Sequence, residues 1–157
     1  MKKRLLAVAV LAASCSAFAD SGVAYPAKYR SDFHVKSMVI NPGHPLYGAV
    51  GGMHHVYANA KAMAGYRAGG KFPDGAVITF DLFEAVDKDN AVSEGAHKAV
   101  IVMAKDAKKH SATDGWGYQV FDPATRKGQL DAKAAADCHA CHLSQKDHGF
   151  VFSRLRD

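Results

Sequence analysis

Hydrophobic side chains gather in short runs through the middle of the chain, in the pattern typical of β-strands. The two longest runs are residues 76–86 (AVITFDLFEAV) and 96–106 (AHKAVIVMAKD). Both are rich in valine, isoleucine and phenylalanine, which strands favour. Residues 53–59 and 115–122 also predict strands, whereas residues 32–40 alternate weakly and fit a strand or a short helix.

Helical patterns flank this region. Residues 60–70 predict a short helix that two glycines end, and residues 133–143 (KAAADCHACHL) contain good helix formers without proline. Glycine and proline predict a loop at 41–52, and polar residues predict a turn or loop at 87–95. Together these patterns predict an α+β, β-rich domain, with an antiparallel sheet, a few flanking helices and a C-terminal helix over the CHACH sequence.

The first 19 residues predict a cleaved secretory signal peptide. A basic start is followed by an apolar run at residues 5–13 and by an A-x-A cleavage sequence at 17–19. This run is too short to span a membrane, and no later stretch is long and apolar enough to do so. The sequence ending at Cys15 loosely resembles a lipoprotein processing site, so lipidation stays open as an alternative. We expect one domain at residues 20–157, exported to the periplasm.

Cleavage at this site changes the charge and the cysteine content. The chain has 157 residues, of which 20 are basic and 15 acidic, and its formal net charge is +5. Loss of Lys2, Lys3 and Arg4 lowers the basic count to 17 and the net charge to +2. So small a charge does not indicate a nucleic-acid surface. The two cysteines that remain, Cys138 and Cys141, belong to a chain that export would bring to an oxidising compartment.

Both cysteines precede His142 in a C-x-x-C-H sequence, the attachment motif of c-type haem. In that chemistry each thiol forms a thioether with a porphyrin vinyl group, and the histidine becomes the proximal iron ligand. A thioredoxin-like redox pair is expected near the start of a βαβ unit, whereas this motif lies near the end of the chain. A structural zinc site needs about four ligands, often with a second cysteine pair, and the chain has no second pair. A plain disulfide would leave His142 without a role. We therefore predict one covalently attached haem c.

The ligand opposite His142 decides the class of function. A second histidine or methionine would saturate the iron and favour electron transfer, whereas an open position would admit small ligands. Composition alone does not choose among the candidates. The candidate sixth ligands are His34, His44, His54, His55, His97, His110, His148, Met38, Met53, Met63 and Met103.

The order of these segments resembles the cytochrome P-460 and cytochrome c′-beta family. The resemblance runs from about residue 29 to residue 156. It is carried by residues 55–86 with their KFPDG turn, and then by VMAKDAKKH, GWGYQVFD, AAADCHACH and the tail FVFSRL. The resemblance implies a β-rich homodimer, a five-coordinate haem with a proximal histidine, and a distal pocket open to small molecules.

The family has two chemical branches, and this chain resembles the second, that of cytochrome c′-beta. In the first branch a lysine of the long strand is bonded to the porphyrin, a glutamate of the next strand assists proton transfer, and hydroxylamine is oxidised. Alignment with the family places Phe80 at the lysine and Ile101 at the glutamate, and His54 at an upstream arginine. In the second branch the lysine is missing, apolar side chains cap the pocket, and nitric oxide or carbon monoxide is bound.

The residue at the lysine position decides between the branches. Phe80 can neither form the lysine bond nor relay the proton that hydroxylamine oxidation requires. An apolar cap lacks the hydrogen-bond donor that helps dioxygen, and so favours nitric oxide and carbon monoxide. We therefore predict a gas-binding cytochrome with no catalytic residue. The alternatives are a hydroxylamine-oxidising enzyme, and an electron carrier with a ligand such as Met53 or His54. Phe80, Ile101 and a half-buried His54 are also each compatible with a purely structural place in a strand.

Overall fold

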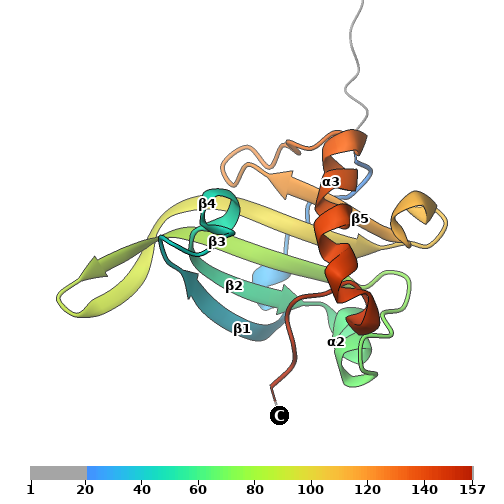
Figure 1. Ribbon diagram of the computed structural model, residues 1–157, viewed down its shortest axis with the longest axis horizontal. Coiled ribbons are helices and arrows are strands. Elements are labelled where there is room, and N and C mark those ends of the chain that lie inside the picture. The colour runs from blue at the N-terminus through green and yellow to red at the C-terminus, as the bar shows by residue number, and fades with distance from the viewer. Residues whose placement is uncertain (1–20, 157) are drawn as a thin grey trace, which may run out of the picture.

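The computed structural model describes residues 21–156, which form one antiparallel sheet with helices packed beside it (Figure 1). The strands lie in chain order, so each pairs with its neighbours in sequence. They are β1 (Phe33–Ile40), β2 (Gly52–Ala58), β3 (Val77–Lys88), β4 (Ala91–Lys105) and β5 (Trp116–Phe121). The predicted α+β, β-rich class is confirmed. The predicted signal peptide, residues 1–19, and Cys15 lie outside the described residues.

The helices are short, and two of them begin at a side-chain cap. Asn59 accepts a hydrogen bond from the backbone N–H of Ala62, and Asp131 accepts one from Ala134, both at 2.8 Å. Each cap satisfies a backbone donor that the first helical turn leaves free. The helical segments are α1 (Tyr47–Val50), α2 (Ala60–Arg67) and α3 (Ala132–His142), with 3-10 turns η1 (Tyr29–Ser31), η2 (Ser111–Thr113) and η3 (Leu143–His148). Within residues 21–156, no helix has the length and hydropathy needed to cross a bilayer.

Two predicted loops differ in the structure. Residues 41–52 contain the single turn of α1, and of the turn or loop predicted at 87–95 only a short turn is present. There β3 and β4 continue as a hairpin whose turn is only Asp89 and Asn90. These residues have φ values of 55° and 61°, which they tolerate and which a two-residue hairpin turn requires. The hairpin end projects from the sheet (Figure 1) and is exposed, so most of its side chains are polar, and the apolar side chains Val86 and Val92 are exposed with them.

The sheet separates two layers, because alternate side chains of a strand point to opposite faces. The helices α2 and α3 and the C-terminal tail pack on one face, which we call the α3 face, with Ile78 and Met103. Residues 23–29 pack on the other, the N-terminal face, with Val100 and Val102. Figure 1 shows α3 in front of the sheet and the blue N-terminal segment behind it.

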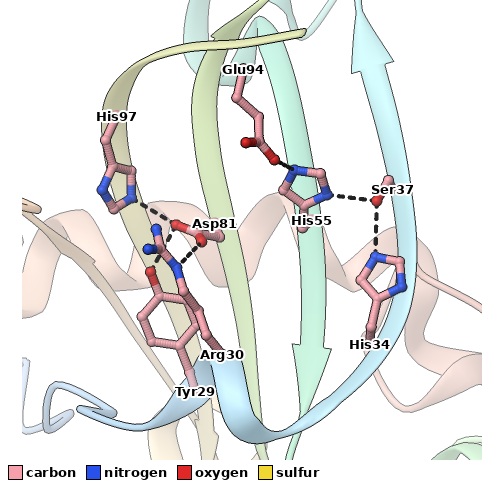
Figure 2. A network of polar contacts seen from close by, with 8 residues as sticks. All are labelled: Tyr29, Arg30, His34, Ser37, His55, Asp81, Glu94 and His97. Carbon is pink, nitrogen blue, oxygen red and sulfur yellow. Dashed lines mark hydrogen bonds and ion pairs between the residues drawn. The ribbon is translucent and has the colours of Figure 1, made fainter.

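A polar network occupies the N-terminal face (Figure 2). The Asp81 carboxylate is 1% exposed and accepts hydrogen bonds from Tyr29 Oη and Arg30 Nε, each at 2.9 Å. His97 Nε2 lies 2.7 Å from the same carboxylate. Burial, and then the bond to Asp81, raise the pKa of Tyr29, so its hydroxyl stays protonated and donates. The network fastens the N-terminal segment to the middle of β3.

Candidate functional site

The C-x-x-C-H residues lie at the C-terminal end of α3, so the predicted helix over this motif is present. Cys138, Cys141 and His142 occupy positions i, i+3 and i+4, which share one side of a helix. Cys138 is half-buried against the core of the α3 face, and Cys141 is exposed. Burial raises the pKa of the Cys138 thiol. The nucleophilic cysteine of a thioredoxin-like pair needs a lowered pKa, so the structure argues against that alternative.

The imidazole of His142 is held in one orientation. Its Nδ1 donates a hydrogen bond to the backbone carbonyl of Phe150 at 2.7 Å. The ring packs between Tyr118 and Phe152, with centroids 5.1 Å and 5.0 Å away. Burial lowers the pKa of His142, and the bond to Phe150 partly opposes this shift. The proton therefore sits on Nδ1, and Nε2 keeps the lone pair that a metal ligand needs.

The segment that supplies this carbonyl is itself fixed by close backbone contact. Gly149 has a φ of 65°, and a Cβ atom there would collide with the carbonyl oxygen of Gly70. Trp116 Nε1 donates to the Gly149 carbonyl at 3.0 Å. Since Gly70 and Trp116 belong to separate parts of the chain, the tail position depends on the folded domain. The tail in turn sets the tautomer of His142.

Another histidine of the motif, His139, anchors α3 to β5. It is 7% exposed, and its Nε2 donates to the Asp114 carboxylate at 2.9 Å. The other ring nitrogen, Nδ1, lies 3.1 Å from Tyr118 Oη. His139 is not among the residues predicted from the sequence. A sequence pattern that could have indicated its burial is the spacing of four residues from Ala135, since both lie on the buried side of the helix.

The residues predicted for the distal side meet on the α3 face. Phe80 pairs with Ile101 across β3 and β4, and Phe80 packs against the same core cluster as Cys138. His54 of β2 stacks on Phe80, with ring centroids 3.9 Å apart and an interplanar angle of 19°. The sequence predicts a half-buried His54, but its exposure is only 2%. Its Nδ1 is buried and has no hydrogen-bond partner among the described residues.

Comparison with known families agrees with this geometry. A family model described as Cytochrome P460 matches residues 26–153. The chain belongs to the cytochrome P460 family. The match covers all the strands, α3 and the Phe150 carbonyl. No curated protein matches the sequence. The resemblance found in the sequence is confirmed at the level of the family, and the chain is a haem-binding cytochrome.

The residues of this cytochrome fit a haem. His142 presents an unprotonated Nε2, and the α3 face offers apolar side chains to a flat, largely apolar ring. A bound haem would supply an iron centre that carries electrons or binds small ligands. Beside α2 and the tail, a cavity of about 380 Å³ is lined in part by Arg67 and Arg154. These guanidinium groups are suited to carboxylates such as haem propionates.

The two faces of the sheet divide the candidate sixth ligands of this cytochrome. Strand register places His54, Met38 and Met103 on the α3 face, because paired residues of neighbouring strands point their side chains to the same face. Met103 pairs with Ile78, and Met38 pairs with His54, which lies two residues from the partner of Phe80. The candidates on the N-terminal face are His34, His55, His97 and Met53, three of them drawn in Figure 2. The candidates outside the strands are His44, His110, His148 and Met63.

Proposed function

We propose that this cytochrome is an exported c-type protein with one haem, bound through thioethers to Cys138 and Cys141. His142 is the proximal ligand of the iron. The observation that carries this proposal is the bond from His142 Nδ1 to Phe150, because it leaves Nε2 unprotonated beside two cysteines on the same side of α3. The C-x-x-C-H motif supports covalent attachment.

We further propose that the iron is five-coordinate and that the protein captures or buffers nitric oxide and also binds carbon monoxide. Phe80 and Ile101 lie on the α3 face and supply apolar surface opposite the motif. No lysine occurs between Lys71 and Lys88. The lysine of β3 is therefore its last residue, Lys88, which is exposed at the hairpin end, and no amine lies near Phe80 in the strand for a porphyrin bond. Hydroxylamine oxidation of the kind found in the sister branch is therefore the less favoured alternative.

Electron transfer is a second candidate, favoured by one observation. His54 is buried on the α3 face with an unpartnered Nδ1, and Met38 and Met103 lie on the same face. Each of the three carries a nitrogen or sulfur atom able to bind iron from the distal side. That arrangement would close the site to gases.

Export and dimer formation also belong to the proposal. The N-terminal sequence supports a periplasmic location. The projecting β3–β4 hairpin carries the exposed apolar side chains Val86 and Val92, which suit contact with a second copy of the chain. Light scattering of the purified holoprotein tests the dimer, since a monomer at all concentrations would contradict it.

Absorption spectra of the holoprotein test the proposed function. We expect a normal c-type Soret band, high-spin in the ferrous state, that shifts with carbon monoxide and with nitric oxide. A band displaced far to the red would indicate a modified porphyrin and favour hydroxylamine oxidation. A low-spin spectrum that ignores both gases would leave the electron carrier. Denaturation with acid and organic solvent should leave the haem attached to the polypeptide.

A further inference from the structure

We infer that His54 is a hydrogen-bond donor to ligands bound in the distal pocket, and that it extends the ligand class to small anions. This inference rests on the proposed haem site. With His54 as a donor, the distal pocket is no longer wholly apolar but contains one buried hydrogen-bond donor. Small ligands with negative charge on the atom facing His54 would then be bound more tightly than Phe80 and Ile101 alone allow.

The burial of His54 without a partner is the first support. The residue is 2% exposed, and its Nδ1 is buried with no hydrogen-bond partner in the described part of the chain. Burying an unpaired polar group costs free energy. Most buried polar groups in native proteins have a hydrogen-bond partner, and where the polypeptide supplies none the partner can be a water molecule, an ion or a ligand. A ligand bound on the α3 face would be such a partner.

Among residues 21–156, the surroundings of His54 Nδ1 offer no hydrogen-bond partner. Its cross-strand neighbours are Met38 on β1 and Leu82 on β3, and Phe80 covers one face of the ring. The charged neighbour Lys36 lies diagonally on β1, where its Nζ contacts Met38 Sδ at 3.9 Å. A cation cannot accept a hydrogen bond from an imidazole N–H.

Register places His54 on the side where the haem is proposed. Val56 pairs with Phe80, and Phe80 pairs with Ile101, without a bulge between these pairs. His54 lies two residues from Val56 in β2, so both side chains point to the α3 face. Phe80 and Cys138 pack against one core cluster. The imidazole is thus on the same face as the attachment motif.

The protonation state suits a neutral donor. Burial, with smaller effects of Lys36 and His55, lowers the pKa of His54 to about 4. The ring is therefore uncharged at neutral pH and carries one N–H. The close stacking on Phe80 limits rotation of the ring, so the donor is held in place before a ligand enters.

The neighbouring residue provides a matched control. His55 is adjacent in sequence but lies on the N-terminal face, where its Nδ1 is 2.6 Å from Ser37 Oγ. Its Nε2 lies 2.6 Å from a carboxylate oxygen of Glu94 (Figure 2). The two groups do not meet hydrogen-bond geometry, so this contact is one between an imidazole and a nearby charge. A change at His55 removes an imidazole of the same strand without altering the α3 face.

The test compares wild type, His54→Leu, His54→Gln and His55→Leu as holoproteins. The probes are fluoride on the ferric protein and carbon monoxide on the ferrous protein. We expect His54→Leu to raise the fluoride dissociation constant about tenfold, the effect of one hydrogen bond, and to move the C–O stretch to higher wavenumber. His54→Gln keeps an N–H and should lie between these values. His55→Leu should match wild type.

Wild type alone provides a readout that does not depend on the folding of any variant. If His54 donates, the iron–fluoride Raman band shifts when the protein is transferred to D₂O. An absent shift, or a His54→Leu protein with wild-type fluoride affinity and C–O stretch, would overturn the inference while gas binding still stands. A low-spin wild type that becomes high-spin in His54→Leu would make His54 an iron ligand and overturn it. A wild type that takes up neither probe would overturn both the inference and the proposed function.

Discussion

Replacement of Gly149 by alanine tests the link between the tail and His142. A Cβ atom at Gly149 would overlap the Gly70 carbonyl oxygen, which is backbone and cannot rotate away. The tail would have to move, and the bonds from Trp116 Nε1 to Gly149 and from His142 Nδ1 to Phe150 would be lost or lengthened. We therefore expect lower stability and a changed environment of His142, the proposed proximal ligand.

The magnitude follows from these contacts. Alanine in the left-handed region, where Gly149 has a φ of 65°, costs about 1 kcal/mol. Each of the two lost hydrogen bonds contributes about 1 kcal/mol. The free energy of unfolding should therefore fall by about 3 kcal/mol, a large effect for a single methyl group.

Gly69→Ala is the matched control. Gly69 has a φ of 67°, but a Cβ atom there meets nothing within 4 Å. This variant should cost only the backbone strain, about 1 kcal/mol. Urea unfolding of the holoproteins measures both values. The iron–histidine stretch of the ferrous protein, which falls when the Nδ1 bond is lost, reports the proximal ligand.

Equal losses of stability in the two glycine variants would refute the close approach of Gly149 to Gly70. A Gly149→Ala protein that is destabilised but keeps the wild-type iron–histidine stretch would refute the link from the tail to His142. The two readouts therefore separate packing of the tail from its effect on the ligand.

Three further predictions concern stability, each measured by urea unfolding. Asp81→Asn should cost about 3 kcal/mol, because it removes a buried charge from three donors, whereas Asp137→Asn, which breaks an exposed pair, should cost less than about 0.5 kcal/mol; equal losses would contradict this. Asp131→Ala should cost about 1 kcal/mol through the lost cap of α3, and Asp131→Asn should restore most of it. The folded pKa of His54, about 4, lies below its ordinary value of 6.5, so the unfolded chain binds more protons between these values and stability falls as the pH drops through this window. The slope due to His54 approaches about 1.4 kcal/mol per pH unit, and His54→Gln should show a shallower loss from pH 7 to pH 5.

The sequence predicts the strands and α3 well because their patterns are local. Residues 76–86 and 96–106 are half-buried strands with many β-branched side chains, and the structure places β3 and β4 there. The hairpin end was missed because exposure on both faces removes the alternation on which strand prediction depends. Its Asp89–Asn90 turn was readable from residue type, since both tolerate positive φ.

The site was only partly readable. The C-x-x-C-H motif predicts the haem-attachment residues, because that chemistry requires fixed spacing. The partner of His142 is a backbone carbonyl, that of Phe150, and a carbonyl leaves no residue-specific signal. Strand parity shows that His54 and His55 face opposite sides, but it does not show which side α3 covers. That assignment needs the packing of distant segments.

The bond from His142 to Phe150 also makes the tautomer of one side chain a property of the tertiary structure. Phe150 follows His142 by eight residues and lies outside α3. The helix alone therefore leaves either ring nitrogen able to carry the proton, and only the tail, held against Gly70 and Trp116, assigns that proton to Nδ1. A change that loosens the tail would thus alter the donor properties of the imidazole without changing any residue of the motif.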